Sequence, residues 1–391
     1  MKILWINPTF LDYRVPVYDE LNKLVNNNLH VVYNANENAT PKRVSEKLKS
    51  CIGNNANGLT GSKTFIIGKG SLTKNNSFAN KFIKINYQPK LLKTVLSYDV
   101  DIIIIEGFFQ WSPVGYIKSL FQKTPVVLSY ERTFHTERNA PKWRELYRKI
   151  VLKLFIDTAV VNGNLSKEYT SYLGLPKDKI TTGGMAADSS FFRKESEKLE
   201  KKLCREQWNF KEDTTVFLYV GRLIELKGIM NLLDSWKSFD KDVLLVCAGD
   251  GDQKDEINNF LSSNNIDNVI LLGAVEYEKL PSLYKASDVF IIPTLEDNWS
   301  LVVPEAMACG LPIACSKYNG CWSELVHDDI NGKVFDPLDK VDTTNMLEYF
   351  YSKKDKLVEM GKESNTIEQK YTPKNAAKAI YEACEIALKG K

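Results

Sequence analysis

The chain has 391 residues, of which 43% are hydrophobic and 26% are charged. This length exceeds one ordinary hydrophobic core and predicts two globular domains, and the composition excludes a mainly disordered protein. No stretch approaches about 20 uncharged apolar residues and the first strand lacks a signal-peptide core, so we expect a cytoplasmic protein without a membrane span.

Charge is distributed unevenly along the chain. The net charge is +3, but residues 1–190 hold 26 Lys and Arg against 15 Asp and Glu, a balance of +11, while residues 191–391 hold 26 against 34, a balance of −8. The first half is therefore predicted to face an anionic partner, such as a membrane surface, a phosphorylated lipid carrier or an acidic glycan. No helix-turn-helix or aromatic-basic RNA motif is present, so nucleic acid is not the expected partner.

The cysteine and histidine content argues against a metal cluster and a disulfide framework. The chain has seven cysteines, an odd number without C-x-x-C spacing, and three histidines. We therefore expect reduced thiols, no bound metal and no other cofactor.

The first half begins with short apolar strands. Strands are predicted at 2–7, 29–33 and 63–67, and a helix follows the first strand from Val15. The Asn-, Gly- and Lys-rich connection at 35–62 is predicted to be a mobile loop, of a kind that often grips acceptors.

Residues 100–105 form a nearly continuous apolar run, which predicts a central strand of a parallel sheet. Open α/β sheets bind ligands beyond the carboxyl ends of their strands. The candidate acceptor-binding residues therefore follow the first strand and the central strand: Tyr13, Arg14, Phe108 and Trp111. Arg14 could bind a phosphate or form a surface ion pair.

A polar aromatic cluster at 130–138 follows the predicted strand at 124–129. Glu131 and His135 are its candidate functional groups. His135 could equally cap a helix or satisfy a polar group in the core.

Residues 141–155 predict a helix that mixes aromatic, apolar and basic residues. Trp143, Tyr147, Ile150 and Leu154 share one face. Two interpretations remain open: the helix covers the sheet and has a solvated basic rim, or its basic residues meet anionic headgroups at a membrane surface. The basic residues are Lys142, Arg148, Lys149 and Lys153.

The second half opens with an apolar strand at 216–220, which is followed by Gly221, Arg222 and Lys227. The glycine permits a tight turn, and the two cations can reach the oxygens of one phosphate group. A βα turn with ordinary surface cations is the alternative.

Residues 288–316 have the pattern of a strand, a polar loop, a helix that begins near Ser300 and a second strand. Asp297 lies in the loop, and Glu305 lies eight residues later, one turn inside the helix. The free N–H groups at the start of a helix attract anions and a carboxylate accepts from vicinal hydroxyls, so the pattern fits a nucleotide sugar. An ordinary βαβ corner with solvated acids is the alternative.

This stretch resembles the E-x7-E signature of family-4 retaining glycosyltransferases, and the resemblance covers 216–337 specifically and the first half in outline. Further motifs in the order of that family are Gly249-Asp250-Gly251, Leu272-Gly273, Leu280-Pro281-Ser282-Leu283-Tyr284, Glu305-Ala306-Met307-Ala308, Gly310, Pro312 and Gly332. Two departures occur. The first glutamate of the signature is Asp297, with Glu296 as a possible substitute, and the usual Gly-Phe-Gly is Asn298-Trp299-Ser300, which adds side chains beside the expected sugar pocket.

The resemblance implies an α/β protein with the GT-B fold, which has two doubly wound, Rossmann-like domains facing a central cleft. The N-terminal domain at 1–190 would bind the acceptor, and the C-terminal domain at 191–370 would bind the nucleotide sugar. A C-terminal helix at 371–391 would cross back to the N-terminal domain.

The resemblance also implies a retaining, metal-independent hexosyltransferase. It would move a hexose from a nucleoside diphosphate sugar to a glycan or lipid-linked acceptor hydroxyl, in the synthesis of a lipid-linked or cell-surface polysaccharide. The implied catalytic residues are Arg222, Lys227, Asp297, Glu131 and His135, with the last two as candidates to lie over the transferred sugar. The implied donor-binding residues are Gly221, Gly273, Val275, Glu296, Asn298, Trp299, Ser300, Leu301, Val302 and Glu305.

Two other functions remain open. A nucleotide-sugar 2-epimerase or hydrolase can share this fold, but would need a denser set of acids and histidines. A catalytically silent sugar-nucleotide-binding subunit is consistent with Asp297 and with the missing glycines. The basic N-terminal domain would suit a cytoplasmic protein that is peripheral at the inner face of the cell membrane.

Overall fold

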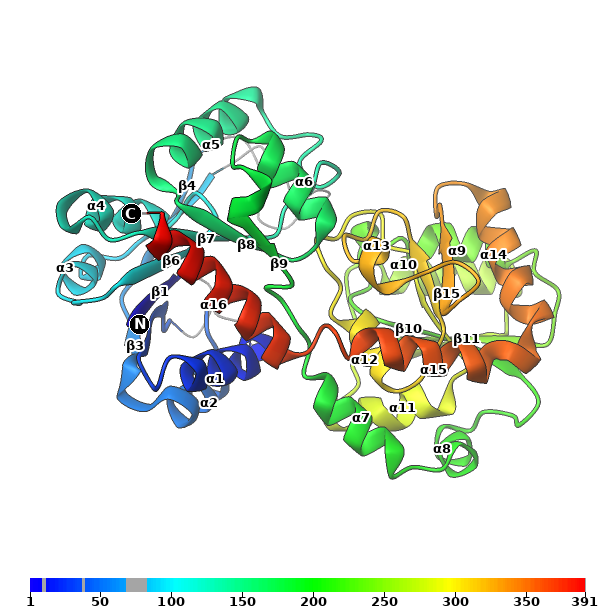
Figure 1. The fold of residues 1–391 in the computed structure, drawn as a ribbon. Helices are drawn as coiled ribbons and strands as arrows, with labels where there is room; N and C mark the ends of the chain where they lie inside the picture. The colour runs from blue at the N-terminus through cyan, green and yellow to red at the C-terminus, as the bar shows by residue number, and fades with distance from the viewer. Residues whose placement is uncertain (9–11, 37–38, 68–82, 391) are drawn as a thin grey trace. The chain divides into compact units, whose positions relative to one another are not determined.

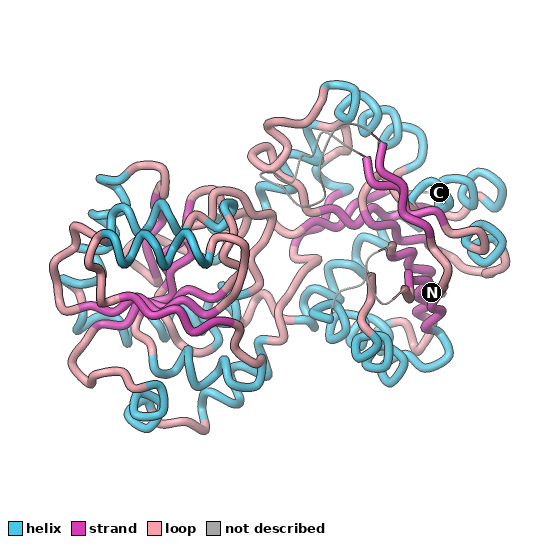
Figure 2. Tube along the Cα trace, turned by 180° about the vertical axis from the view of Figure 1, so that it is seen from behind, coloured by secondary structure: helices cyan, strands magenta, loops and turns pink. Residues whose placement is uncertain are grey.

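The computed structural model describes residues 1–391 except 9–11, 37–38, 68–82 and 391. The chain divides into two compact units, each with its own parallel sheet between helices (Figures 1 and 2). Unit 1 comprises Met1–Ala186 and Pro373–Lys391, and unit 2 comprises Ala187–Thr372.

Unit 1 is built on a seven-stranded parallel sheet with the strand order β3-β2-β1-β6-β7-β8-β9. Its strands are β1 (Ile3–Asn7), β2 (Leu29–Asn34), β3 (Ala56–Leu59), β6 (Ile102–Glu106), β7 (Val126–Tyr130), β8 (Thr158–Val161) and β9 (Ile180–Thr182). The apolar runs of β1 and β6 are buried on both faces of the sheet, as expected for strands that have helices on both sides. The helices and turns of this unit are η1 (Asp12–Arg14), α1 (Val15–Leu24), α2 (Lys42–Ile52), η2 (Gly53–Asn55), α3 (Leu91–Leu96), α4 (Ser112–Gln122), α5 (Lys142–Phe155), α6 (Asn164–Tyr172), η3 (Lys177–Lys179) and α16 (Pro373–Lys389).

The connection at 35–62 contains α2 and β3, so the prediction of a mobile loop is wrong. The helix α2 is amphipathic and buries Val44, Leu48 and Ile52, and β3 pairs in parallel with β2. The many polar residues of this segment obscured a short apolar stripe at helical spacing. Residues 37–38 of the connection lie outside the described residues.

The strand predicted at 63–67 is confirmed as β4 (Lys63–Ile67), but it lies outside the main sheet. It pairs antiparallel with β5 (Ile83–Tyr87) in a separate two-stranded ribbon.

The C-terminal helix α16 packs in unit 1, against α1 and the strands β8 and β9. Its apolar face belongs to the same buried cluster as β1 and α1. The hydroxyl of Thr158 donates to the carbonyl oxygen of Ala383 at 2.9 Å, and that of Thr181 donates to the carbonyl oxygen of Ala379 at 2.9 Å. The last turns of the chain therefore complete the core of unit 1.

Unit 2 is built on a six-stranded parallel sheet with the order β12-β11-β10-β13-β14-β15. Its strands are β10 (Thr215–Val220), β11 (Val243–Ala248), β12 (Val269–Gly273), β13 (Val289–Ile292), β14 (Ile313–Ser316) and β15 (Gly332–Phe335). Its helices and turns are α7 (Ser189–Glu197), α8 (Lys201–Trp208), η4 (Glu225–Lys227), α9 (Ile229–Trp236), α10 (Lys254–Ser263), η5 (Tyr277–Lys279), α11 (Leu280–Ala286), α12 (Val302–Ala308), α13 (Trp322–Leu325), α14 (Lys340–Ser352), η6 (Lys354–Lys356) and α15 (Leu357–Glu368).

Each sheet reverses its strand order beside its first strand. β1 lies between β2 and β6, and β10 lies between β11 and β13. The carboxyl ends of strands at such a switch point form the usual ligand-binding edge of an open α/β sheet.

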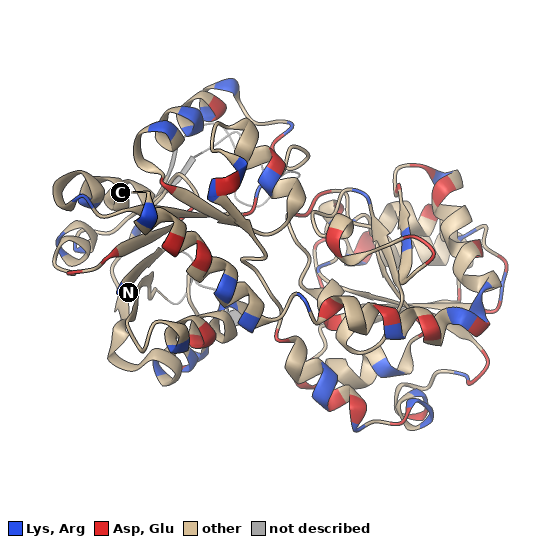
Figure 3. Cartoon of the chain, in the orientation of Figure 1, with Lys and Arg blue, Asp and Glu red and all other residues tan. Residues whose placement is uncertain are grey.

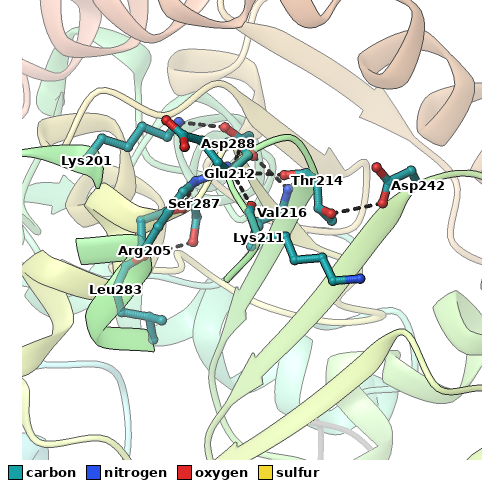
Figure 4. Close-up of polar contacts among 11 residues, drawn as sticks. Lys201, Arg205, Lys211, Glu212, Thr214, Val216, Asp242, Leu283, Ser287 and Asp288 are labelled. Atoms are coloured by element: carbon teal, nitrogen blue, oxygen red, sulfur yellow. Dashed lines mark hydrogen bonds and ion pairs between the residues drawn. The ribbon is translucent and has the colours of Figure 1, made fainter. Parts of the chain in front are cut away.

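Arg205 and Asp288 tie the amino ends of the unit 2 strands together (Figure 4). The Arg205 guanidinium forms an ion pair with Asp288 and donates to the carbonyl oxygens of Ala286 and Thr214, at 3.1 and 3.2 Å. Asp288 also accepts from the amide of Val216 at 2.7 Å. These contacts join α8 to the starts of β10 and β13, at the end of the sheet opposite the candidate site.

Candidate functional site

Lys227 is positioned by the turn that follows β10. This turn contains η4 and ends at Gly228, which has a φ of +68° and precedes α9. A Cβ at Gly228 would lie 2.1 Å from the carbonyl oxygen of Pro293, so only glycine allows the turn to come this close to the end of β13.

The loop after β13 is hydrogen-bonded to the same turn. The amide of Leu295 and the hydroxyl of Thr294 both donate to the carbonyl oxygen of Leu226, at 2.8 and 2.9 Å. The ammonium of Lys227 forms an ion pair with Oδ2 of Asp297. The two segments therefore make one corner at the carboxyl ends of β10 and β13.

Asp297 lies at the centre of this corner and is 8% exposed. The hydroxyl of Ser300 donates to its Oδ2 at 2.6 Å, and the amide of Trp299 donates to its Oδ1 at 3.1 Å. Burial by itself raises the pKa of Asp297, but the Lys227 ammonium and these hydrogen bonds outweigh burial and hold the pKa below its usual value. Asp297 is therefore an ionised carboxylate at neutral pH, and protein groups hold both of its oxygens.

A second loop, which follows β14, packs against the same corner. The amide of Gly320 donates to the carbonyl oxygen of Asp297 at 2.9 Å, and a Cβ at Gly320 would lie 1.9 Å from the carbonyl oxygen of Asn298. Asn298 Oδ1 and Asn319 Nδ2 are buried, and neither has a hydrogen-bond partner within the described part of the chain. Buried amide groups of this kind normally have a hydrogen-bond partner, so these two atoms are exceptions within the corner.

Arg222, the second predicted cation, is exposed and follows β10. Its carbonyl oxygen accepts from the hydroxyl of Tyr219 at 2.8 Å. Burial raises the pKa of Tyr219, the charge of Asp297 raises it further, and the charge of Arg222 opposes both. Asp297 and Arg222 are therefore both close enough to Tyr219 for their charges to affect its pKa.

Glu305 lies in the first turn of α12 and is 8% exposed. The hydroxyl of Tyr284, in α11, donates to Oε2 of Glu305 at 3.2 Å. Burial and the charge of Glu305 raise the pKa of Tyr284, so this hydroxyl remains a proton donor. Tyr284 was missed as a site residue, although it lies in a motif that the sequence already singled out.

The helix α12 begins at Val302, after Leu301 and two residues later than predicted. Both residues are half-buried. Glu296 is fully buried, and Trp299 is 5% exposed with its ring centre 6.2 Å from that of Tyr371. Most of this predicted donor loop is therefore packed into unit 2.

The exits of β10, β11 and β12 are in close contact. A Cβ at Gly249 would lie 1.8 Å from the carbonyl oxygen of Gly221, and the amide of Gly249 donates to the carbonyl oxygen of Gly273 at 2.7 Å. Val275 follows Gly273 and is half-buried. The structure thus brings these predicted residues to one edge of the sheet.

In unit 1, Arg14 meets Glu106 at the switch point between β1 and β6. The two side chains lie 3.1 Å apart, and the Trp5 indole and the Ser129 hydroxyl donate to the Glu106 carboxylate at 2.8 and 3.2 Å. Burial raises the pKa of Glu106, and Arg14 and these hydrogen bonds act against it. Tyr13 lies beside Arg14, and burial raises its pKa to about 12. Glu106 was not among the predicted site residues, although the sequence already placed it at the carboxyl end of the central apolar strand.

Glu131 and His135 follow β7, on the same edge of the sheet. After burial, the charges of both Glu131 and Glu106 contribute to the raised pKa of Tyr13. The carbonyl oxygen of Glu131 accepts from the hydroxyl of Ser166 at 2.9 Å. His135 is half-buried in the turn beyond it. Glu131 is therefore close enough to Tyr13 for its charge to affect the pKa of that residue.

Phe108 and Trp111 belong to the core of unit 1 and are 2% and 1% exposed. The ring of Phe108 packs edge-on against Tyr130, with the centres 5.0 Å apart. The Trp111 indole donates to the carbonyl oxygen of Asn86 at 2.8 Å. Their side chains thus support the sheet rather than present a surface to an acceptor.

Within the described residues, no group of three or more His, Cys, Asp or Glu side chains is arranged to hold a metal ion. None of the helices in that part of the chain has both the length and the apolar character needed to cross a bilayer.

Comparison with known proteins identifies the class to which unit 2 belongs. Residues 200–366 match the family model of glycosyl transferases group 1 and form a domain of that kind. The fold of the chain is the predicted GT-B fold, which is confirmed by similarity to solved structures. One of these is Anabaena HepE in complex with UDP, with a TM-score of 0.75, 17% identity and coverage of 98% of this chain and 99% of that one.

Two curated relatives share part of the sequence. An uncharacterized glycosyltransferase of Methanocaldococcus jannaschii is 30% identical over 44% of this chain and 45% of its own length. The lipopolysaccharide 1,2-N-acetylglucosaminetransferase of Salmonella typhimurium is 28% identical over 46% of this chain and 50% of its own length. The chain thus matches half or less of the length of each of these relatives.

Proposed function

We propose that the protein is a retaining glycosyltransferase that moves a hexose from a nucleoside diphosphate sugar to an acceptor hydroxyl without a metal ion. The observation that carries this proposal is the corner at the carboxyl ends of β10 and β13, where Lys227 and Asp297 form an ion pair and Arg222 lies exposed nearby. Cations at the ligand-binding edge of a group 1 domain suit the diphosphate of a sugar donor.

Stabilisation of the departing diphosphate is assigned to Lys227 and Arg222. The charge on the diphosphate grows as the bond to the sugar breaks, so fixed cations at this place lower the barrier. The helix α12 has only seven residues, so the amides at Ser300 to Val302 contribute less than the cations. Asp297 holds Lys227 in place before the donor arrives and shares it with the diphosphate afterwards.

We assign binding of the ribose and of the donor sugar to the carboxylates of the corner. Glu305 accepts from Tyr284 through Oε2 and would also accept from a ribose hydroxyl. Asp297 or Glu296 would orient the donor sugar, with Asn298 beside them. Gly273 and Val275 would border the base at the end of β12.

We assign to unit 1 the binding of the acceptor and the contact with the reacting edge of the donor sugar. Glu131 is favoured over His135 because it shares the surroundings of Tyr13 and Glu106. Tyr13 and Arg14 would contact the acceptor. Retention then follows from attack on the face that the diphosphate leaves, with a phosphate oxygen accepting the proton, so no protein nucleophile is needed.

We propose that the reaction is a step in the synthesis of a lipid-linked or cell-surface polysaccharide. Two relatives support this, a lipopolysaccharide N-acetylglucosaminetransferase of Salmonella typhimurium and an O-antigen chain mannosyltransferase of Escherichia coli. The Anabaena protein of similar fold has been crystallised with UDP and with UDP-glucose, which makes uridine donors the first to test.

The test of the diphosphate assignment is transfer by Lys227→Ala and Arg222→Ala, with Lys237→Ala as the control. Loss of one preorganised charge should lower kcat by about 100-fold to 1,000-fold. Lys237 also pairs with an aspartate, but it is an exposed residue that follows α9, so its variant should keep normal turnover. Near-normal turnover in both site variants would remove the proposal.

The ribose assignment is tested by comparing Glu305→Gln with Glu305→Ala. The glutamine variant can keep the contact with Tyr284, whereas alanine leaves that buried hydroxyl without its partner. The donor KM should rise most in the alanine variant, and thermal shift with UDP should show weaker binding. Donor binding unchanged in both variants would refute the role of Glu305. Free hexose as the only product would instead indicate a hydrolase.

A further inference from the structure

We propose that the outward face of α5 docks on an anionic membrane surface. This face, called the α5 face below, comprises Trp143, Leu146, Ile150 and Leu154, which are 48%, 60%, 48% and 64% exposed. The proposal rests on the burial and charge of this helix and does not depend on the proposed transfer reaction.

The side of α5 that faces the unit 1 sheet is unusually basic. The buried residues of the helix are Arg144, Arg148, Val151 and Leu152. A helix that merely covers a sheet turns its apolar stripe inward and its charges outward. Here two arginines are turned inward while the largest apolar side chains remain outside.

The inward position of the arginines is stabilised by specific contacts. The Arg148 guanidinium donates to the Glu137 carboxylate at 2.7 Å and to the Tyr169 hydroxyl at 3.1 Å, and both charged side chains are almost fully buried. The Arg144 guanidinium lies 5.8 Å from the centre of the Phe109 ring. The orientation of α5 is therefore fixed by buried charge interactions, and its apolar stripe cannot turn inward without breaking them.

The α5 face is a continuous stripe. At about 100° per residue, its four side chains fall within roughly 80° of the helix circumference. Exposed apolar side chains of this size are common singly, but a contiguous group marks an interaction surface.

Unit 1 also exposes apolar side chains on α4. The ring of Tyr116 in α4 stacks on Phe155 at the end of α5, with the centres 5.0 Å apart. One turn further along α4, Leu120 and Phe121 are 67% and 79% exposed.

The charge beside the stripe selects the partner. At about 100° per residue, Lys142, Lys149 and Lys153 fall along one flank of the α5 face, and Glu145 is the single acidic residue of the helix. Figure 3 shows that the charged segments of α5 are mostly Lys and Arg. Glu145 pairs with Lys149 at 2.7 Å, and Lys142 and Lys153 are exposed. A stripe of Trp, Leu and Ile flanked by lysines is the composition of helices that lie in the interface of anionic bilayers. Two copies of the chain that met symmetrically through this face would bring their lysines together, which disfavours a dimer.

The experiment is co-sedimentation of the full chain with vesicles of phosphatidylglycerol and phosphatidylcholine, and with vesicles of phosphatidylcholine alone. Ile150→Glu and Leu146→Glu should each weaken binding to the anionic vesicles by at least about tenfold, because each places a charge where an apolar side chain inserts. Val358→Glu is the control, since Val358 is 68% exposed but lies in α15 of unit 2. Circular dichroism and melting temperature verify that these surface variants are folded.

The electrostatic part is tested separately. Lys142→Gln and Lys153→Gln should each reduce anionic-vesicle binding by about fivefold, and raised salt should do the same for the wild type. Quenching by brominated lipid should include a component that disappears in Trp143→Phe.

Three results would overturn the proposal: equal binding to both kinds of vesicle, no loss of binding in Ile150→Glu, or a concentration-dependent dimer that Ile150→Glu dissociates. UDP binding should be unchanged in Ile150→Glu. A chain that fails as a transferase but still binds vesicles through this face leaves the inference intact.

Discussion

Replacement of Lys227 by methionine removes the cation from the corner between β10 and β13. Methionine keeps the length and apolar stem of lysine, so the packing changes little. Asp297 is then left 8% exposed, with the Ser300 hydroxyl and the Trp299 amide as its remaining described donors. Lys227→Met should therefore destabilise unit 2 through the uncompensated carboxylate.

The size of the effect follows from the geometry. Two unit charges in contact at about 3 Å attract by roughly 5 kcal/mol at an effective dielectric constant of about 20. Desolvation of both groups offsets much of this attraction, but removal of one partner from a buried pair costs about 3 to 5 kcal/mol. The two remaining hydrogen bonds reduce the penalty, so we expect a loss of about 3 kcal/mol at neutral pH. The double variant Lys227→Met/Asp297→Asn should recover part of it, with a coupling of about 2 kcal/mol.

The assay is urea unfolding, combined with hydrogen exchange of the Leu295 and Trp299 amides, which reports the local opening of this corner. Lys237→Met is the matched control. Lys237 pairs with Asp234, but the side chains are 34% and 48% exposed, so its loss should cost less than about 1 kcal/mol. Equal losses in Lys227→Met and Lys237→Met, with a coupling below about 0.5 kcal/mol, would refute the reasoning.

Three further outcomes are expected. Gly228→Ala should lower the melting temperature well beyond Gly273→Ala, because both have positive φ but only the first adds a Cβ 2.1 Å from a carbonyl oxygen; similar shifts would contradict the close approach. Arg205→Met should cost about 3 to 5 kcal/mol in urea unfolding, whereas Lys201→Met, which removes a more exposed cation from the same aspartate, should cost less than about 1. Because the pKa of Asp297 is lower in the folded state than the ordinary 3.8, its stabilising contribution is full above that pH and is lost as the pH falls through the folded value. The stability advantage of the wild type over Asp297→Asn should therefore shrink in acid unfolding below about pH 3.8, and a constant difference would contradict the assigned shift.

The corner in unit 2 could be anticipated because its determinants are local. An apolar strand that is followed by Gly221 and a second strand that ends before Asp297 are both visible in the sequence, and parallel strands place their carboxyl ends on one edge. The partner of Asp297 could not be anticipated. It depends on the close approach at Gly228, which joins segments about 70 residues apart in the chain.

The errors in unit 1 arise from tertiary context. The segment at 35–62 is polar in composition, but three apolar residues spaced along α2 are enough to anchor a helix once β2 is present. The sequence could not separate the two interpretations of α5. Its periodicity predicts an apolar stripe but does not indicate whether that stripe faces the sheet or the solvent. The contacts of Arg148 with Glu137 and Tyr169 decide that, and both partners lie outside the helix.

The placement of α16 has a consequence for the order of events during synthesis. The side chains that α16 adds to the core beside α1 are the last apolar groups in the described chain. Unit 2 lies wholly between the two segments of unit 1, so a ribosome produces all of unit 2 before it supplies the helix that closes unit 1. The apolar surface that α16 covers in unit 1 therefore stays exposed in the first 186 residues while unit 2 is synthesised. Chaperones that bind exposed apolar surface should therefore remain bound to nascent unit 1 for longer than to nascent unit 2.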